Sequence, residues 1–255
     1  MTPPPTRSPD QTVFEHADLE VAAIQRALLP AKLPNLSGWT IASHYLPCDA
    51  SGGDFYGFQD RNTNELMLLV ADVSGHGARA AVIMAMLRAW LESHQAYKRE
   101  AINIAHDINA LFNRMDGLGV FVTGVFARIG IADGSFNYIN CGHPYPRILR
   151  ADGTLDLLTD GHCLPLGIAE DLGLEAPGHG TLNPGDTLVI NTDGIPESAA
   201  PDGTRFEDAR LNASLRAQGD ATAIRNSTLR ALAEFRQTAP RLDDECMLVI
   251  KRNPA

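Results

Sequence analysis

Several aspartates of this chain stand beside glycines at the ends of apolar segments, where a carboxylate is suited to binding a cation. They are Asp54 in SGGDFYG, Asp72 in VADVSGHG, Asp193 in INTDGIPE, and the pair Asp243 and Asp244 in RLDDECMLVI. Each adjoins a segment predicted to be a buried strand, and burying an unpaired charge is costly. Carboxylates that meet at one end of a sheet repel one another unless a cation compensates their charge. The pattern indicates a cation site built from aspartates.

The ligand types indicate which cation and which chemistry to expect. Carboxylate oxygens without a histidine or cysteine cluster suit Mg²⁺ or Mn²⁺ rather than zinc. The sequence contains neither HExxH nor a Cys/His spacing of a zinc hydrolase, no GxxxxGK[ST] phosphate loop, and no GxSxG serine-nucleophile turn. The cysteines form no CxxC pair and are predicted to be buried, reduced thiols, as in a cytosolic protein; they are Cys48, Cys141, Cys163 and Cys246.

Composition narrows the class of protein further. The chain has 255 residues, 44% of them hydrophobic, and a formal net charge of −10, which fits one large domain and argues against non-specific nucleic-acid binding. No apolar run approaches the length of about 20 residues that crosses a bilayer. The start, MTPPPTRSPD, lacks the apolar core of a signal peptide. We expect a cytoplasmic protein with no membrane and no nucleic-acid partner.

A helix is predicted over residues 10–29, after a disordered leader at 1–9. Its apolar residues follow the three-four spacing of a helix seam: Phe14, Ala17, Val21, Ile24 and Leu28. Pro30 ends the helix, because proline disfavours helix in the residue before it. This segment either packs on its own domain or pairs two protomers and receives a signal. The prediction of a possible homodimer depends on the second alternative.

The rest of the chain, 30–253, reads as one α+β domain. Strands are predicted at 39–47, 52–58, 65–73, 119–131, 134–142, 145–150, 155–161, 184–194 and 245–252, and helices at 77–94, 100–115, 206–215 and 221–235. Residues 62–64, Asp133–Gly134 and Asp152–Gly153 mark hairpin turns. Strands in hairpin-sized steps with helices grouped between them favour a layered α+β fold over repeated βαβ units.

The order of these segments resembles a known family. IQRALLP, GGDFYG, ADVSGHGARAA, FVTGVFARI, NCGHPYPRIL, LPLGI, PGDTLVINTDGIPES and DDECMLVI follow one another, as in the bacterial type 2C metal-dependent serine/threonine phosphatases, in the branch of the stage-II sporulation phosphatase and the RsbU-type sigma-factor regulators. The resemblance covers about residues 24–251. It implies a four-layer αββα sandwich of two antiparallel sheets flanked by helices, with an N-terminal helical extension.

The resemblance also implies roles for individual residues in a site holding two divalent cations, Mn²⁺ or Mg²⁺. Asp72 would bridge both metals, with the Val73 carbonyl as a further ligand, and Asp54 would bind one metal. The other metal would be bound by Asp193 and by Asp243, with Asp244 as the alternative to Asp243. Through metal-bound water, Asp54, Asp72, Asp193 and Asp243 would be the catalytic set. The family's histidine two positions after the bridging aspartate is replaced here by Ser74, so His76 does not inherit its role.

The activity implied is hydrolysis of a phosphoserine or phosphothreonine protein, with a phosphorylated anti-anti-sigma factor as the substrate and a sensor or receiver domain as an upstream partner. Metal-activated water would attack phosphorus in line. Two other functions remain open from the sequence: a phosphatase-like regulatory module that binds without turnover, and hydrolysis of a small phosphomonoester.

Overall fold

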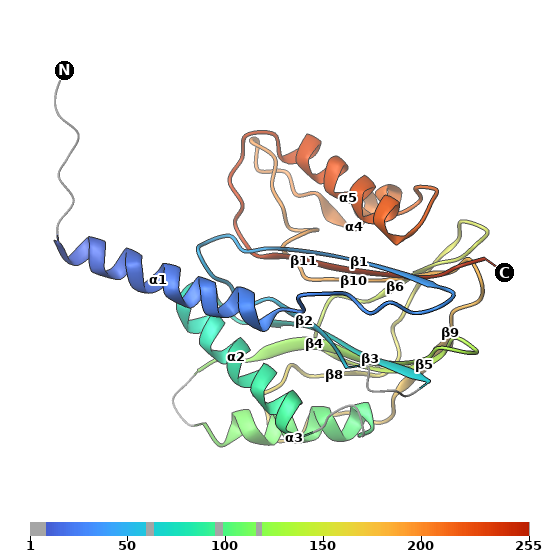
Figure 1. Cartoon of the computed structure of the whole chain (residues 1–255), viewed down its shortest axis with the longest axis horizontal. Coiled ribbons are helices and arrows are strands. Elements are labelled where there is room, and N and C mark those ends of the chain that lie inside the picture. Colours follow the sequence, from blue (N-terminus) through green and yellow to red (C-terminus); the bar gives the residue numbers. More distant parts are fainter. Residues whose placement is uncertain (1–8, 60–63, 95–98, 116–118, 255) are drawn as a thin grey trace.

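Two β-sheets lie face to face, and a pair of helices covers the outer face of each, as Figure 1 shows. The computed structural model describes residues 9–59, 64–94, 99–115 and 119–254. The five-stranded sheet has the order β1 (Trp39–Leu46), β11 (Glu245–Arg252), β10 (Thr187–Asn191), β6 (Arg147–Leu149) and β7 (Leu155–Leu157). The six-stranded sheet has the order β2 (Phe55–Gln59), β3 (Glu65–Val73), β4 (Val122–Gly130), β5 (Ser135–Cys141) and β8 (His162–Cys163), with β9 (Gly178–Thr181) also paired to β5.

Strand β3 shows why the chain forms this sandwich. Successive side chains of a strand point to opposite faces of its sheet. In β3, Leu68 and Val70 enter the apolar cluster between the sheets, whereas Leu69 and Ala71 pack under α2 (Gly77–Ser93) and α3 (Ala101–Asn113). Both faces of the strand are therefore buried, which explains its continuous apolar run.

A third apolar cluster closes the other side of the sandwich. There α4 (Glu207–Ser214) and α5 (Ala221–Arg236) cover the five-stranded sheet through residues such as Leu211, Ile224 and Val249. The predicted four-layer αββα arrangement is confirmed. One strand pair departs from the antiparallel expectation, because β8 runs parallel to β5.

Most predicted elements are confirmed with small shifts at their ends. The hairpin β2–β3 and the turns at Asp133–Gly134 and Asp152–Gly153 join antiparallel strands. Residues 62 and 63 of the predicted first turn lie outside the described part. The strands β8 and β9 were not predicted, because they are two and four residues long and β9 reads GHGT. Neither segment has the alternation of apolar side chains by which a strand is identified in a sequence.

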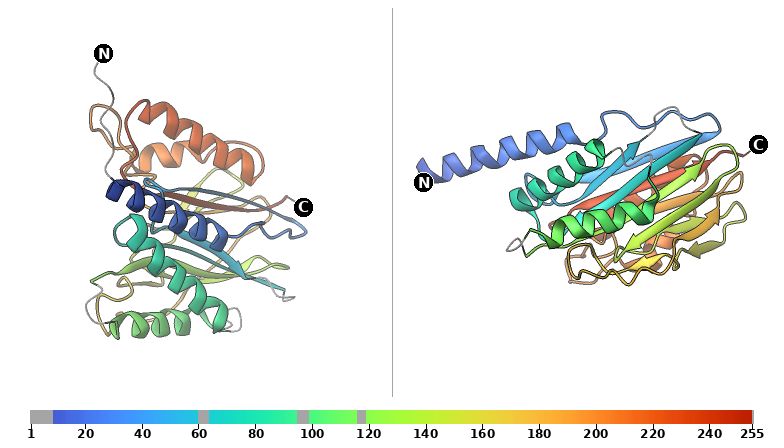
Figure 2. Two further views of the ribbon diagram at one scale, coloured as in Figure 1. Left: turned by 60° about the vertical axis from the view of Figure 1, so that its left-hand side comes forward. Right: turned by 90° about the horizontal axis from the view of Figure 1, so that it is seen from below.

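The N-terminal helix α1 (Pro9–Leu28) leans on α2 with its C-terminal half and extends beyond the body of the molecule (Figure 2). Residues 1–8 of the predicted leader lie outside the described part. Ala22 and Gln25 are the buried residues of the described helix surface, whereas Ile24 of the predicted stripe is 61% exposed. Val21 and Leu28 of the stripe are half-buried, so the described stripe faces the domain only in part, and the side chains of Phe14 and Ala17 lie outside the described part. Among the described helices, none is both long enough and apolar enough to cross a bilayer.

Candidate metal centre

The first two predicted site residues come from neighbouring strands of the six-stranded sheet. Asp54 immediately precedes β2, and Asp72 is the penultimate residue of β3. The antiparallel register pairs Phe55 with Ala71, so Asp54 and Asp72 stand next to each other across the two strands. The backbone N–H of Val73 donates to the Gly53 carbonyl at 3.4 Å, which keeps the loop before β2 against the end of β3.

The other predicted residues come from the five-stranded sheet. Asp193 follows β10, and the pair Asp243–Asp244 precedes β11. Because β10 and β11 are antiparallel, the end of one and the start of the other meet at the same edge. Thr192 joins the sheets there, since its hydroxyl donates to Asp54 Oδ2 at 2.8 Å and accepts the backbone N–H of Cys246 at 3.0 Å. The structure thus brings the carboxylates of both sheets to one end of the sandwich.

Their electrostatics are those of crowded anions. Burial, and next the charge of Asp72, raise the pKa of Asp54 well above its ordinary range. Burial raises the pKa of Asp72 to about 7, with further contributions from Asp193 and Asp243. The pKa values of Asp193 and Asp243 are also raised, again first by burial. At each of these four carboxyl groups, the charge of at least one neighbouring carboxylate adds to the effect of burial.

Asp243 and Asp244 point to different surroundings. Asp244 is 2% exposed, and its two oxygens accept the backbone N–H groups of Cys48 and Gly53 at 2.8 and 2.7 Å. Asp243 is exposed and lies close enough to Asp193 to raise its pKa. Its Oδ1 accepts the backbone N–H of Asp244 at 2.8 Å. Asp244 therefore holds the loop before β2, whereas Asp243 lies on the exposed side, near Asp193.

Two glycines make room for that arrangement. A Cβ at Gly52 would collide with the Asp244 carboxylate, and one at Gly194 would collide with the Asp244 carbonyl oxygen. In the structure these two admit another segment of the chain, so they act by positioning Asp244.

The donor set fits a hard divalent cation. Asp54, Asp72, Asp193 and Asp243 offer carboxylate oxygens, which Mg²⁺ and Mn²⁺ prefer. The raised pKa values show that the protein alone leaves this negative charge uncompensated. A bound dication would offset that repulsion. The Val73 carbonyl, predicted to be a further ligand, lies against Gly53 at the same edge of the sandwich.

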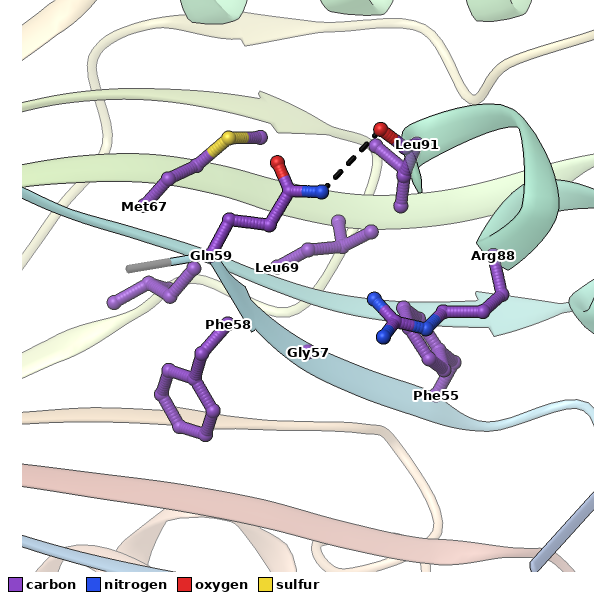
Figure 3. A pocket seen from close by; sticks show the side chains of 9 residues that line it. Phe55, Gly57, Phe58, Gln59, Met67, Leu69, Arg88 and Leu91 are labelled. Carbon is purple, nitrogen blue, oxygen red and sulfur yellow. Dashed lines mark hydrogen bonds between the residues drawn. The ribbon is translucent and has the colours of Figure 1, made fainter. Parts of the chain in front are cut away.

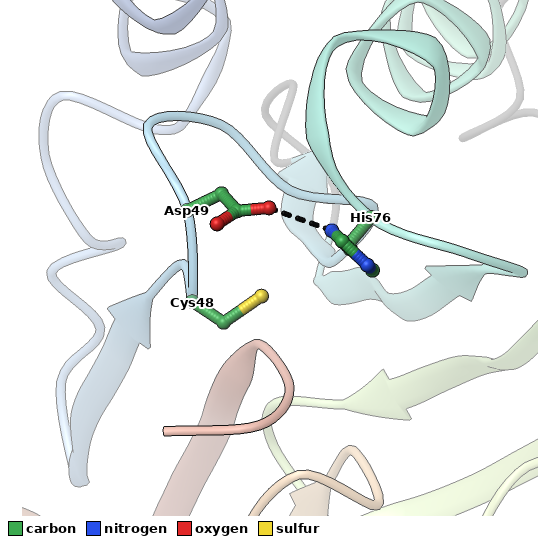
Figure 4. Close-up of side chains that lie close together, drawn as sticks. All are labelled: Cys48, Asp49 and His76. Atoms are coloured by element: carbon green, nitrogen blue, oxygen red, sulfur yellow. Dashed lines mark hydrogen bonds and ion pairs between the residues drawn. The ribbon is translucent and has the colours of Figure 1, made fainter. Parts of the chain in front are cut away.

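The side chains at the rim of this site were not predicted to be metal ligands. Cys48 is half-buried rather than buried, and its Sγ lies within 4.8 Å of carboxylate oxygens of Asp243 and Asp244. Burial and the charge of Asp244 raise the pKa of this thiol to about 12. Asp49 and His76 stand beside it, as Figure 4 shows. The signal available in the sequence was the position of Cys48 and Asp49 shortly before SGGD, with Ala50 between.

His143 takes a structural place next to the centre. Its Nδ1 lies 2.8 Å from the hydroxyl of Thr123, the residue that pairs with Asp72 across the strands. The side-chain amide of Asn140 bonds both backbone groups of His143, at 2.8 and 3.0 Å. Burial lowers the pKa of His143 to about 3, so the imidazole is neutral at physiological pH and orients Thr123.

Two concavities lie near these elements. A groove of mixed polar and apolar lining lies beside Asp243 and is lined by Glu197, Arg205 and Leu242, among others. A smaller apolar pocket lies between β2, β3 and α2, where Gln59 Nε2 donates to the Leu91 carbonyl at 3.3 Å (Figure 3). The small pocket contains none of the predicted ligands, whereas the groove opens onto the carboxylates.

Comparison with known proteins places this geometry in a family. The sequence profile described as Stage II sporulation protein E (SpoIIE) matches residues 62–253. The phosphoserine phosphatase RsbU of Bacillus subtilis is 27% identical over 190 residues, which cover 73% of this chain and 56% of RsbU. Protein IcfG of Synechocystis sp. is 25% identical over 259 residues, which cover 90% of this chain and 40% of IcfG. The chain thus spans about half the length of these relatives.

A solved structure shows the same fold. The SiaA-PP2C domain of Pseudomonas aeruginosa superposes with a TM-score of 0.80 over 95% of this chain and 97% of that one, at 21% sequence identity. The likeness extends over both sheets and their helices. The match of the family description over residues 62–253 confirms the family that the motifs indicated: this chain belongs to the Stage II sporulation protein E (SpoIIE) family.

Proposed function

We propose that this chain is a metal-dependent phosphatase that hydrolyses phosphoserine or phosphothreonine in a regulatory protein. The observation that carries the proposal is the meeting of Asp54 and Asp72 from one sheet with Asp193 and Asp243 from the other. Membership of the SpoIIE family supports it. So does the similarity to RsbU, which is named a phosphoserine phosphatase.

Each carboxylate of the centre has a proposed role in binding one or both of two divalent cations. Asp72 is the proposed bridging ligand, because the charges of three other aspartates raise its pKa. The Val73 carbonyl is the proposed further ligand. Asp54 serves the first of two divalent cations, and Asp193 and Asp243 serve the second. Bound cations supply a water of lowered pKa and neutralise charge on the phosphoryl oxygens. The side chains themselves hold these positions, so most of the rate enhancement comes from positioning and charge stabilisation.

Supporting residues keep the ligands in place. Thr192 holds Asp54 by the 2.8 Å hydrogen bond to its carboxylate. Asp244 holds the loop that carries Asp54 through its bonds to Cys48 and Gly53. Because both supports are buried, they keep the carboxylates in a fixed geometry before any cation arrives. Asp244 is therefore proposed as a positioning residue, not as a ligand.

A folded phosphoprotein suits the entrance to the site. The groove beside Asp243 has a mixed polar and apolar lining, with the ion pair of Arg205 and Glu197 at 2.8 Å and the exposed side chain of Leu242. Such a surface offers both charged and apolar contacts to a peptide segment. The proposed substrate is a phosphorylated anti-anti-sigma-type protein, in the cytoplasm, under control of an upstream sensor or receiver domain.

Helix α1 is the proposed route for that control. Helix α1 packs against α2, which follows the turn after Asp72 and Val73. Gln25 of α1 forms hydrogen bonds with Gly52 in the loop before Asp54. The exposed Leu19 and Ile24 leave an apolar surface on the same helix, which would serve to pair two protomers. A shift of α1 would therefore be felt at the ligands.

The test is phosphate release from a phosphoserine protein with Mn²⁺, with a chelator, and with Asp72→Asn. We expect turnover that needs the metal and is abolished by the substitution. A folded wild-type chain that binds Mn²⁺ but releases no phosphate would contradict catalysis and leave a binding module. Faster release from p-nitrophenyl phosphate than from any phosphoprotein would instead favour a small phosphomonoester as the substrate.

A further inference from the structure

A second group of metal-ligand side chains lies on the rim of the carboxylate centre. Cys48 and Asp49 belong to the loop between β1 and β2, and His76 precedes the first residue of α2. One ligand atom from each, a sulfur, a carboxylate oxygen and an imidazole nitrogen, lies within 4.8 Å of the other two. In Figure 4 the three side chains point toward one another across the gap between the loop and the helix.

The chemistry of this trio differs from that of the four aspartates. Thiolate, imidazole and carboxylate together are ligands of zinc, whereas Mg²⁺ and Mn²⁺ favour oxygen alone. With zinc–ligand bonds of about 2.0 to 2.3 Å, tetrahedral ligand atoms lie roughly 3.3 to 3.8 Å apart. His76 Nδ1 and Asp49 Oδ2 are 2.6 Å apart, so small side-chain rotations place all three at the required separation.

The site has space for such a rotation. The side chains of His76 and Asp49 are 62% and 55% exposed, so they have room to rotate, and solvent can fill a fourth coordination position. Cys48 is held more firmly, because its backbone N–H donates to Asp244 at 2.8 Å. One fixed thiol and two adaptable side chains make a workable three-residue site.

We propose that Cys48, Asp49 and His76 bind a Zn²⁺ ion at a site separate from the carboxylate centre. On binding, the bond from zinc to Cys48 Sγ replaces the S–H bond, and the proton leaves to solvent. The hydrogen bond from His76 Nδ1–H to Asp49 Oδ2 breaks, the Nδ1 proton passes through solvent to Nε2 as the ring changes tautomer, and Nδ1 and Oδ2 become ligands. This inference does not rest on the proposed phosphatase activity, because it concerns other side chains and another metal.

Zinc at this position would affect the carboxylate centre mechanically. The loop that carries Cys48 and Asp49 continues into Gly53 and Asp54, and the turn that carries His76 follows the end of β3, where Asp72 lies. A zinc ion would join these two segments across the entrance. Cys48 Sγ also lies within 4.8 Å of Asp243, so the ion would occupy space next to a proposed ligand of the other centre. We expect zinc to lower metal-supported turnover.

Binding is tested on the full chain with Co²⁺ as a spectroscopic substitute for zinc, followed by zinc displacement in competition with a chromophoric chelator. We expect a thiolate-to-cobalt charge-transfer band that Zn²⁺ removes. Cys48→Ser should abolish the band, and His76→Ala should weaken zinc binding about tenfold or more, as removal of a ligand does. His179→Ala is the matched control, because His179 is exposed and lies on β9, outside the trio.

Asp72→Asn separates the two centres. It should leave the cobalt–thiolate band intact while removing metal-dependent phosphate release. Absence of the band in the wild-type chain overturns the proposal, and so does wild-type zinc affinity in His76→Ala, which alters an exposed side chain and should fold. A chain that shows the band but releases no phosphate keeps the zinc site and loses the phosphatase proposal.

Discussion

Gln25 pairs with both backbone groups of Gly52: its Nε2 donates to the Gly52 carbonyl at 2.6 Å, and the Gly52 N–H donates to its Oε1 at 3.0 Å. Gln25 is 3% exposed. The next residue, Gly53, donates to Asp244, and Asp54 follows it. The side-chain amide of Gln25 thus joins helix α1 to the loop that carries Asp54, a proposed metal ligand. It does so with a pair of hydrogen bonds to one residue, as in a β-ladder.

Replacing that amide should weaken metal binding. Gln25→Ala leaves the N–H and carbonyl of Gly52 without partners in a buried place, at a cost of about 2 kcal/mol in the free energy of unfolding. We expect the Mn²⁺ concentration for half-maximal activity to rise several-fold, with a smaller change in maximal rate. Ala23→Ser, at an exposed position of the same helix, is the control. An unchanged Mn²⁺ dependence would contradict a role of α1 in metal occupancy.

Removing a central charge should stabilise the metal-free protein while destroying its activity. Burial and three neighbouring aspartates oppose the ionisation of Asp72. Asp72→Asn relieves this repulsion, so the free energy of unfolding at pH 7.5 in chelator should rise, on the order of 1 to 3 kcal/mol. Urea denaturation measures it. A loss of stability would show that the carboxylate serves the fold rather than a cation.

The metal-free protein should lose stability as the pH rises. The pKa of Asp72 is raised from 3.8 to about 7 in the folded chain, so the folded state binds more protons than the unfolded state between those values. The contribution of Asp72 to the free energy of unfolding is therefore fully present below about pH 4 and is lost as the pH rises through about 7.

Urea denaturation at intervals from pH 5 to 8, in chelator and in excess Mg²⁺, checks this pH dependence. The fall should be steep in chelator and shallow in Mg²⁺, because the cation replaces the protons. Asp72→Asn should flatten the curve in chelator. A curve of the same slope with and without Mg²⁺ would show that the cation binds elsewhere.

Asp243 and Asp244 should differ in what their loss affects. Both oxygens of Asp244 accept backbone N–H groups, and an asparagine offers one acceptor oxygen, so Asp244→Asn should cost about 2 kcal/mol of stability. Asp243→Asn should leave stability nearly unchanged and weaken Mn²⁺ binding at least about tenfold. Urea denaturation and Mn²⁺ titration by calorimetry separate the two effects. The reverse result would make Asp244 the ligand.

The hydroxyl of Thr192 should be needed for stability and activity, whereas that of Thr187 should not. Thr192→Val removes the donor to Asp54 and the acceptor for the Cys246 N–H, which should cost about 1 to 3 kcal/mol and lower kcat. Thr187 is equally buried, but its hydroxyl has no hydrogen bond among the described residues, so Thr187→Val should be neutral or stabilising. Equal effects of both substitutions would refute the linking role of Thr192.

Much of the fold was predictable because its signals are local. The helix expected at 77–94 is α2 at Gly77–Ser93, since its apolar residues repeat with the period of a helix. The hairpins at Asp133–Gly134 and Asp152–Gly153 formed as expected for the same reason. The strands β8 and β9 escaped prediction because only their partner β5 makes them strands.

The aspartates of the candidate centre were also identified from the chain alone, since a carboxylate next to glycine at the end of an apolar strand is a local pattern. Their spatial meeting, and the division between Asp243 and Asp244, depended on the register of β10, β11 and the loop before β2. The same holds for Gln25 on Gly52 and for the trio of Cys48, Asp49 and His76. The types and order of residues determined the layers and the ligand chemistry, because secondary structure and donor preference are properties of short segments. Only the packed tertiary structure decided which atoms meet, because those contacts join residues that are distant along the chain.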